Sequence, residues 1–110
     1  MKKAMVILAM LVGIHSQSAN ASYITNKDFA AFTEEQKHWW YSGTFTNLGH
    51  VAAIHDGQNM ADCIWRWYFD NIDRRKAQLD KSYVQYPEHT PSAVIISLLK
   101  RDCGAFKSGN

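Results

Sequence analysis

The sequence has few cysteines, few prolines and no excess of charge of either sign. Its 110 residues include two cysteines and two prolines. The formal net charge is +2, and Lys2 and Lys3 supply all of it, because residues 22–110 hold ten Lys plus Arg against ten Asp plus Glu. A neutral chain lacks the basic surface that nucleic-acid binding requires and the acidic bias of a disordered tail. We therefore expect one folded domain that binds no nucleic acid.

Motifs of catalysis and metal binding are also missing. The sequence has no G-x-S-x-G motif and no glycine-rich phosphate loop. Its exported histidines form neither H-x-x-x-H nor H-E-x-x-H, the spacings at which two imidazoles on one helix face bind zinc. We therefore expect no catalytic residue, no metal ligand and no cofactor, and we interpret the protein as not being an enzyme.

The first 21 residues have the three parts of a secretory signal peptide. Lys2 and Lys3 form the basic start, residues 4–14 are apolar, and Ala19-Asn20-Ala21 is an A-x-A cleavage site. At about 1.5 Å of rise per residue, the apolar run falls well short of a membrane core of roughly 30 Å. We expect an exported, periplasmic protein that consists of residues 22–110 and has no membrane span in its mature form.

Export decides how the two cysteines are interpreted. The compartment outside the cytoplasm is oxidising, and an even number of cysteines in a small exported domain favours a disulfide over a metal or redox role. The sequence has no C-x-x-C motif. We therefore expect a bond between Cys63 and Cys103, closing a loop of about 40 residues and worth on the order of 4 kcal/mol.

Hydrophobic periodicity predicts a first long helix that begins after Thr33 and ends at Asp56-Gly57. Thr33 and Gln36 have the spacing of a capping box. Gly43 and Gly49 lie inside this helix, so either a neighbouring helix approaches closely there or the helix bends. Four apolar residues define its buried face: Tyr41, Phe45, Leu48 and Ala52.

Further helices are predicted over 60–70, 71–86 and 91–103. The last has Thr90 as N-cap, Pro91 at its first position and Gly104 after its end. The 71–86 helix has a narrow apolar seam of Ile72, Leu79, Tyr83 and Tyr86. Residues 22–32 should lead into the bundle with at most one short turn, and residues 105–110 should fray. The predicted fold is a small all-α bundle of about four helices, stapled by one disulfide.

The 60–70 segment is apolar around most of its circumference. On a helical wheel its apolar residues occupy about 240°, and Asp62, Arg66 and Asp70 share the rest. Such a helix is either the central helix of the bundle or one whose outer face meets another protein. The same outer arc would suit a contact between two copies of the chain, so a homodimer stays open.

Aromatic residues are abundant: residues 22–110 contain 14 aromatic residues against 13 Ile, Leu and Val residues. Each aromatic side chain buries roughly 150–250 Å², so these residues suit the core of a small domain. They also suit a recognition surface, because Trp, Tyr and Arg are enriched at binding hot spots. The candidates for contact with a protein partner are Trp39, Trp40, Trp65, Arg66 and Phe69.

The stretch from Cys63 to Cys103 resembles the Rap/Tai class of type VI secretion immunity proteins. The residues that carry the resemblance are Tyr86-Pro87, Pro91, the apolar run from Ala93 to Leu99, and the two cysteines. The resemblance implies a small exported helical protein that neutralises an amidase toxin. The segment after Cys63 is rich in Trp where that class has small residues, and nothing in residues 22–62 matches. No toxin-contacting residue is therefore carried over.

Size, export, helical content and a single cysteine pair are also similar to those of the Hde acid-stress chaperones. Two functions follow as hypotheses. The first is an immunity or inhibitor module that neutralises an effector acting on the cell envelope. The alternative is a periplasmic chaperone that exposes apolar surface on acidification. A structural accessory of the envelope is not separable from these on sequence.

Overall fold

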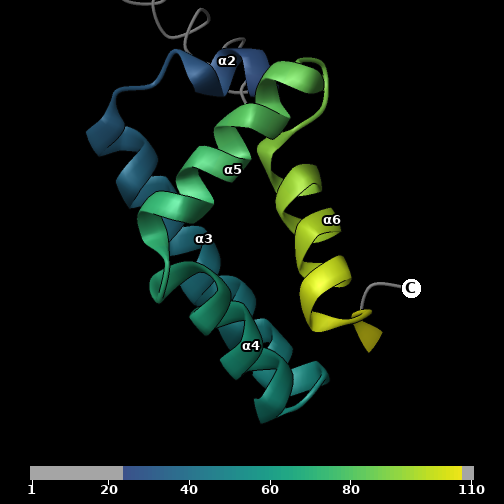
Figure 1. Cartoon of the computed structure of the whole chain (residues 1–110). Helices are drawn as coiled ribbons and strands as arrows, with labels where there is room; N and C mark the ends of the chain where they lie inside the picture. The colour runs from purple at the N-terminus through teal and green to yellow at the C-terminus, as the bar shows by residue number, and fades with distance from the viewer. Residues whose placement is uncertain (1–23, 108–110) are drawn as a thin grey trace, which may run out of the picture.

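The computed structural model describes residues 24–107, so the predicted signal peptide at 1–21 lies outside the described residues. Within this range the chain forms helices and no strand (Figure 1). The helices are α2 (Asn26–Ala30), α3 (Glu34–His55), α4 (Gln58–Phe69), α5 (Ile72–Gln85) and α6 (Pro91–Cys103). The prediction of a small all-α bundle is confirmed.

The longest helix, α3, begins and ends where the sequence predicts. The Thr33 hydroxyl accepts from the Gln36 amide at 3.1 Å, and the Gln36 side chain accepts from the Thr33 amide at 2.9 Å. At the other end, Gly57 has a φ of +98°, which L side chains rarely adopt. This glycine lets the chain reverse at once, so α3 and α4 form an antiparallel pair (Figure 1).

The last helix, α6, also has the predicted caps. The Thr90 hydroxyl accepts from the Ala93 amide at 3.2 Å, and Gly104 follows the helix with a φ of +99°. On α5, Leu79 and Tyr83 of the predicted seam are buried, but Tyr86 is exposed. The seam was therefore predicted one turn too long, because the helix ends at Gln85 and Tyr86 already belongs to the loop before α6.

The segment predicted as a lead-in with at most one short turn contains the five-residue helix α2, which is a structural part of the bundle. The Thr25 and Asp28 side chains form a capping box at its start. Asn26 is fully buried, and its backbone N–H and side-chain amide donate to His89 O and Tyr86 O, both at 2.7 Å. These bonds attach α2 to the loop between α5 and α6.

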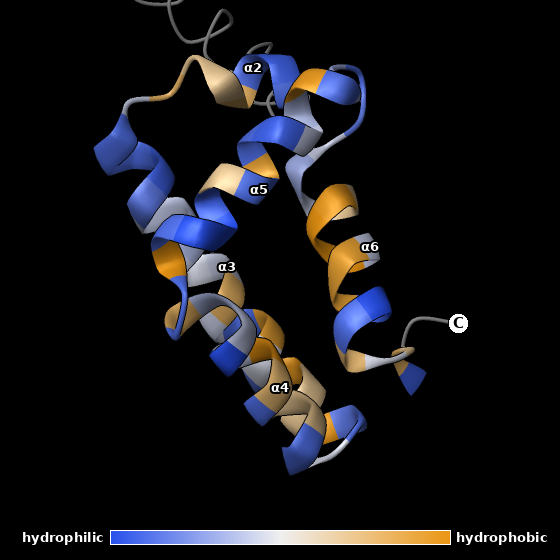
Figure 2. Ribbon diagram, viewed as in Figure 1, coloured by the Kyte–Doolittle hydropathy of each residue, from blue (hydrophilic) through white to orange (hydrophobic). Residues whose placement is uncertain are grey.

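Stacked and tilted aromatic rings fill the core. The Phe45 and Tyr68 rings stack with centroids 4.2 Å apart, and the Tyr41 and Tyr83 hydroxyls hydrogen-bond at 2.7 Å. Phe29 of α2 is fully buried and meets both Tyr41 and Tyr83 edge to face. Aliphatic residues are concentrated on α6 and the α3–α4 pair, whereas α5 is mostly hydrophilic (Figure 2).

The predicted frayed tail at 105–110 differs from the structure over 105–107. Phe106 packs against the core, and the Lys107 amide donates to an Asp56 carboxylate oxygen. Residues 108–110 lie outside the described range. No helix in residues 24–107 is both long enough and apolar enough to cross a membrane.

Candidate protein-binding surface

Helix α4 contacts α3, α5 and α6, and its contacts are together more extensive than those of any other described helix, so it is the central helix of the bundle. Its buried residues are Ala61, Ile64, Trp67 and Tyr68. Of the two interpretations of its broad apolar arc, this arrangement supports the central helix rather than a helix whose outer face meets another protein. The remainder of the helix has two flanks: one carries Trp65 and Phe69 beside α3, and the other carries Arg66 and Asp70 beside α5 and α6.

On the first flank, Trp65 lies directly on the backbone of α3. A Cβ atom added to Gly49 would come within 1.9 Å of the Trp65 Nε1. The same Nε1 donates to Thr46 O at 3.4 Å, and the indole meets the His50 ring edge to face at 5.3 Å. Of the two explanations for the glycines of this helix, close approach applies at Gly49, whereas Gly43 has nothing within 4 Å of its added Cβ.

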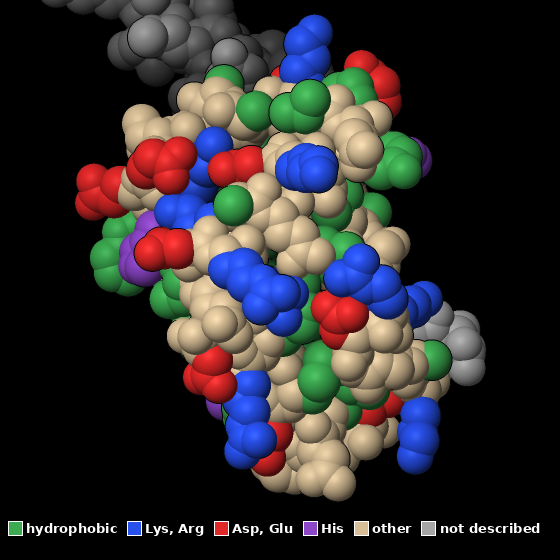
Figure 3. Space-filling model, viewed as in Figure 1, with side chains coloured by type: hydrophobic (Ala, Val, Ile, Leu, Met, Phe, Trp, Pro, Cys, Tyr) green, Lys and Arg blue, Asp and Glu red, His purple; other side chains and the backbone are tan. Residues whose placement is uncertain are grey.

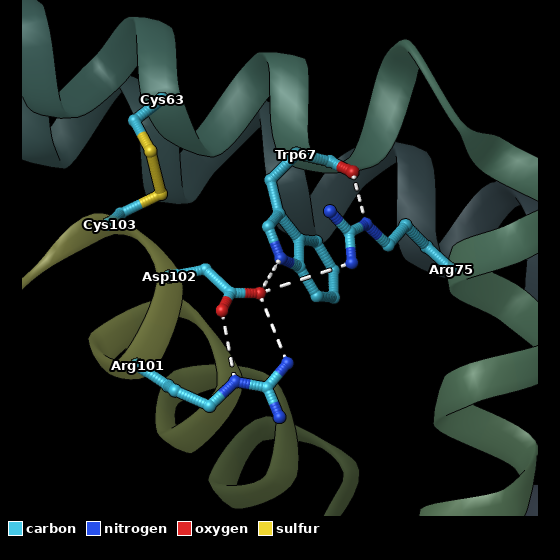
Figure 4. The surroundings of a disulfide bond; sticks show 6 residues. All are labelled: Cys63, Trp67, Arg75, Arg101, Asp102 and Cys103. Atoms are coloured by element: carbon cyan, nitrogen blue, oxygen red, sulfur yellow. Dashed lines mark hydrogen bonds and ion pairs between the residues drawn. A yellow bond between two sulfur atoms is a disulfide. The ribbon is translucent and has the colours of Figure 1, made fainter.

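On the second flank, four side chains from three helices form the Asp102 network: Trp67, Arg75, Arg101 and Asp102 (Figure 4). The Trp67 indole donates to Asp102 Oδ2 at 2.7 Å, and Arg101 Nε donates to Asp102 Oδ1 at 2.9 Å. The Arg75 guanidinium lies 4.1 Å from the centre of the Trp67 ring, and its Nε donates to Trp67 O at 2.8 Å. A cation over an indole face and a charge-assisted acceptor for a buried indole N–H are both stabilising arrangements.

The predicted disulfide is confirmed and lies beside this network (Figure 4). It joins Cys63 of α4 to Cys103, the last residue of α6. Since Asp102 is the preceding residue, a covalent bond and a hydrogen bond fix the same end of α6 to α4.

The pKa values of two members of the network, Asp102 and Arg75, are shifted. The Arg101 hydrogen bonds and then that of Trp67 lower the pKa of Asp102 to about 2. Burial is the main cause that lowers the pKa of Arg75, followed by repulsion from Arg74. Asp102 therefore stays ionised, and its role in the described residues is to hold α4, α5 and α6 together.

The five residues predicted to contact a partner have different surroundings. Trp40 packs on the core with its ring 4.9 Å from that of Phe29, and Trp65 is half-buried on Gly49. Arg66 is exposed, lines a polar cleft beside the Asp102 network and forms no ion pair in the described residues. Phe69 is exposed at the end of α4.

Trp39 is the only exposed tryptophan among the four that the structure describes. Its side chain is 66 % exposed, and its single aromatic neighbour within the described range is His38, at 5.3 Å. No acceptor for its indole N–H is found among residues 24–107. Large, rigid side chains with a free polar group are typical of binding hot spots.

The outer side of α3 forms, with the neighbouring flank of α4, a surface that we call the aromatic face. It comprises Trp39, Gly43, Thr46, His50, Trp65 and Phe69. The four residues of α3 follow one another at helical spacing on the side opposite the buried Tyr41 and Phe45. Trp65 reaches over α3 to Thr46 and His50, and Phe69 is one turn further along α4.

The α3 part of this face carries no charged side chain beyond its start, where Glu35 lies one turn before Trp39. Residues 38–55 contain no Lys, Arg, Asp or Glu. On the side of the molecule seen in Figure 3, charged side chains are spread over α4, α5 and α6. Depletion of charge is a property of the centres of protein–protein interfaces. This uncharged run is visible in the sequence, but the candidate residues were not chosen from it.

No group of three or more His, Cys, Asp or Glu side chains in residues 24–107 is placed to hold a metal ion. Apart from Lys37, which is buried near the start of α3 and paired with Glu34, the buried titratable groups are tyrosines of the core. Burial raises the pKa of Tyr68 to about 12, and its hydroxyl has no hydrogen-bond partner in the described structure. These groups lie inside the bundle, away from any of the surfaces described above.

Comparison with known proteins gives no further assignment. No protein-family model matches the chain, and neither a curated protein nor a solved structure matches it. The similarities to the Rap/Tai class and to the Hde chaperones therefore stay predictions.

Proposed function

We propose that this protein is an exported binding module that neutralises an effector protein in the periplasm. The aromatic face is the surface that binds the effector, with Trp39 as the anchoring side chain. The leader at 1–21 delivers the protein to the compartment in which such an effector acts. The resemblance of residues 63–103 to the Rap/Tai class points to the same activity.

The observation that carries this proposal is the exposure of Trp39 in an uncharged surface. Transfer of a largely exposed indole into a partner's pocket removes much apolar area from water, at about 25 cal/mol per Å². The free indole N–H then needs an acceptor, which an effector surface can supply. The other candidates have secondary roles: Phe69 enlarges the aromatic face, and Trp65 packs on the backbone of α3 within it.

The test is capture of the partner from envelope extract of the source cell at neutral pH, read by mass spectrometry. Three versions of the tagged mature protein serve as bait: wild type, Trp39→Ala and Val84→Ala. Val84 is a matched control because it is 82 % exposed but lies on α5, away from the aromatic face. We expect wild type and V84A to retain one stoichiometric protein, and W39A to bind it at least about 30-fold more weakly, or about 2 kcal/mol.

The captured protein must also lose its own activity when the wild-type protein is added. Retention of activity in the complex would reject neutralisation, although not binding. Equal capture by wild type and W39A would reject Trp39 as the anchor.

The alternative, an acid-activated chaperone, requires contacts that break when carboxylates are protonated. The Asp102 network supplies one, but the low pKa of Asp102 keeps it intact until the pH approaches about 2. Binding of an apolar dye during acidification tests this alternative. Dye binding that begins well above that pH, with no partner captured at neutral pH, would favour the chaperone.

A homodimer through the outer arc of α4 is not favoured as part of this proposal. That arc divides into an aromatic flank assigned to the effector and a polar flank that contacts α5 and α6.

A further inference from the structure

The stripe of α3 that carries Trp39 continues beyond His50 to a second exposed apolar side chain. Ile54 lies one turn after His50, and its side chain is 78 % exposed. At about 100° per residue, Trp39, Gly43, His50 and Ile54 fall within about 60° of arc on this helix. Trp39 and Ile54 are 15 positions apart, or about 22 Å along the axis. Two large apolar side chains therefore project from the two ends of one stripe.

Between these two ends the stripe has no bulky apolar side chain and no charge. Gly43 and Thr46 are both exposed, and a Cβ atom added to Gly43 meets nothing within 4 Å. Residues 38–55 contain no Lys, Arg, Asp or Glu. Packed helices have axes about 8–10 Å apart, and small contact residues favour the shorter distance. An element that covers this stripe can therefore lie close to α3 between Trp39 and Ile54.

The backbone of α3 decides which kind of element can cover the stripe. In a helix each N–H bonds to the carbonyl four residues earlier, so α3 offers no row of free backbone groups to a partner. An extended strand or a loop laid along the stripe would lose water from its own N–H and C=O groups without gaining partners for them, which is costly. A helix satisfies its own backbone and buries only side chains in such a contact.

A single carboxylate stands at one end of the stripe. Glu35 lies one turn before Trp39, is exposed, and makes no ion pair in the described part of the chain. A cationic side chain on the covering element would complement it. The surface therefore fits a helix with uncharged side chains along its contact face and a Lys or Arg at one end.

We propose that the aromatic face binds one α-helix of the effector, laid lengthwise over α3 from Trp39 to Ile54. About 15 residues of that helix span the stripe. Its apolar side chains contact Trp39 and Ile54 at the two ends, its backbone approaches α3 at Gly43, and its Lys or Arg faces Glu35. This inference rests on the proposed function and specifies which part of the effector is bound.

Photo-crosslinking to the purified, captured effector tests the proposal. A photo-crosslinking phenylalanine analogue replaces Trp39 in one variant and Ile54 in a second, and mass spectrometry locates the cross-linked residues. A helix along the stripe should give cross-links about 15 positions apart in the effector, whereas an extended segment should give cross-links about 7 positions apart. Cross-links at the shorter spacing, in two unrelated segments, or between two copies of this chain would overturn the proposal.

Binding by substituted proteins tests the same contact. Ile54→Lys should weaken binding of the effector at least about 30-fold, because it places an ammonium in an uncharged contact. Val84→Lys is the matched control, since Val84 is 82 % exposed near the end of α5, and it should leave binding unchanged. Gly43→Leu should weaken binding about tenfold although leucine is apolar and favours a helix, because its side chain fills the space that the effector helix needs.

The charge contact has its own variant. Glu35→Lys should weaken binding about tenfold at low ionic strength, because two cations then face each other, and added salt should reduce the difference. Circular dichroism establishes that each variant is folded.

Failure of this inference and failure of the proposed function give different results. An effector that W39A loses but I54K and G43L retain would leave the proposed function in place and reject the bound helix. A wild type that captures no stoichiometric partner would reject the proposed function and this inference together.

Discussion

The two flanks of α4 are held to their neighbours in different ways. The flank beside α3 depends on shape: the Nε1 side of the Trp65 indole occupies the space left by the missing side chain of Gly49. The flank beside α5 and α6 depends on a disulfide, a buried indole that donates to Asp102, and an arginine over the same indole. One helix thus combines a packing contact with a covalent and ionic one.

Because the two flanks are held in different ways, we expect substitution, reduction and acidification to affect them differently. A shape-dependent contact fails when one atom is added, whatever the pH. A covalent contact fails only on reduction or substitution of cysteine, and an ionic one weakens when its carboxylate is protonated. The following three predictions test these responses separately, beginning with the largest effect.

Removal of the disulfide should have the largest effect on stability. The double variant Cys63→Ala/Cys103→Ala frees a loop of about 40 residues, which should lower the free energy of unfolding by about 4 kcal/mol. Urea denaturation of the variant and of the wild type measures the difference. A loss below about 1 kcal/mol would mean that the Asp102 network and apolar packing hold α6 without the bond.

The two glycines of α3 test the packing contact on the other flank. Gly49→Ala should lower the free energy of unfolding by about 2 kcal/mol, because Trp65 must leave its position on the helix. Gly43→Ala is the matched control: the added methyl meets nothing within 4 Å, and alanine favours a helix by up to about 1 kcal/mol. Thermal unfolding compares both variants with the wild type, and a G49A protein as stable as G43A would contradict the close contact.

Loss of the ionic contact at low pH should lower the free energy of unfolding by about 1 kcal/mol. The folded-state pKa of Asp102, about 2, is below the ordinary value of 3.8, so its contribution is complete above about pH 4 and is lost as the pH falls towards 2. Asp102→Asn should therefore be less stable than the wild type at pH 5 and equal to it near pH 2.

The control on the same flank is Asp70→Asn. Asp70 is exposed and makes no ion pair in the described residues, so its variant should follow the wild-type curve at every pH. Stability curves of D102N and D70N that coincide would remove Asp102 from the set of contacts that hold α6.

The helices were predictable because their signals are local. Capping residues such as Thr33 and Thr90, and glycines after helix ends, act within a few positions of the chain. The disulfide followed from an even cysteine count and the expected compartment. One short turn was allowed in residues 22–32, but α2 could not be located there because five residues are too few for a periodic pattern. What stabilises it is the burial of Phe29 and Asn26 against distant elements.

The candidate site was predicted in part. Composition identified Trp39, Trp40, Trp65 and Phe69 as candidates, but it could not tell which of these side chains are exposed. Tertiary contacts cover two of them. Trp40 packs on Phe29, which is eleven positions earlier in the chain, and Trp65 packs on Gly49 across the helix pair. The Asp102 network joins residues that are up to 35 positions apart, and no local pattern connects them.

The central claim is that the aromatic face binds a protein partner. Amide hydrogen exchange of the mature protein, alone and in complex with the captured partner, tests it most directly. The account predicts added protection in α3 from Trp39 to His50 and at the end of α4 near Phe69. Protection confined to α5 and α6, with α3 unchanged, would contradict it.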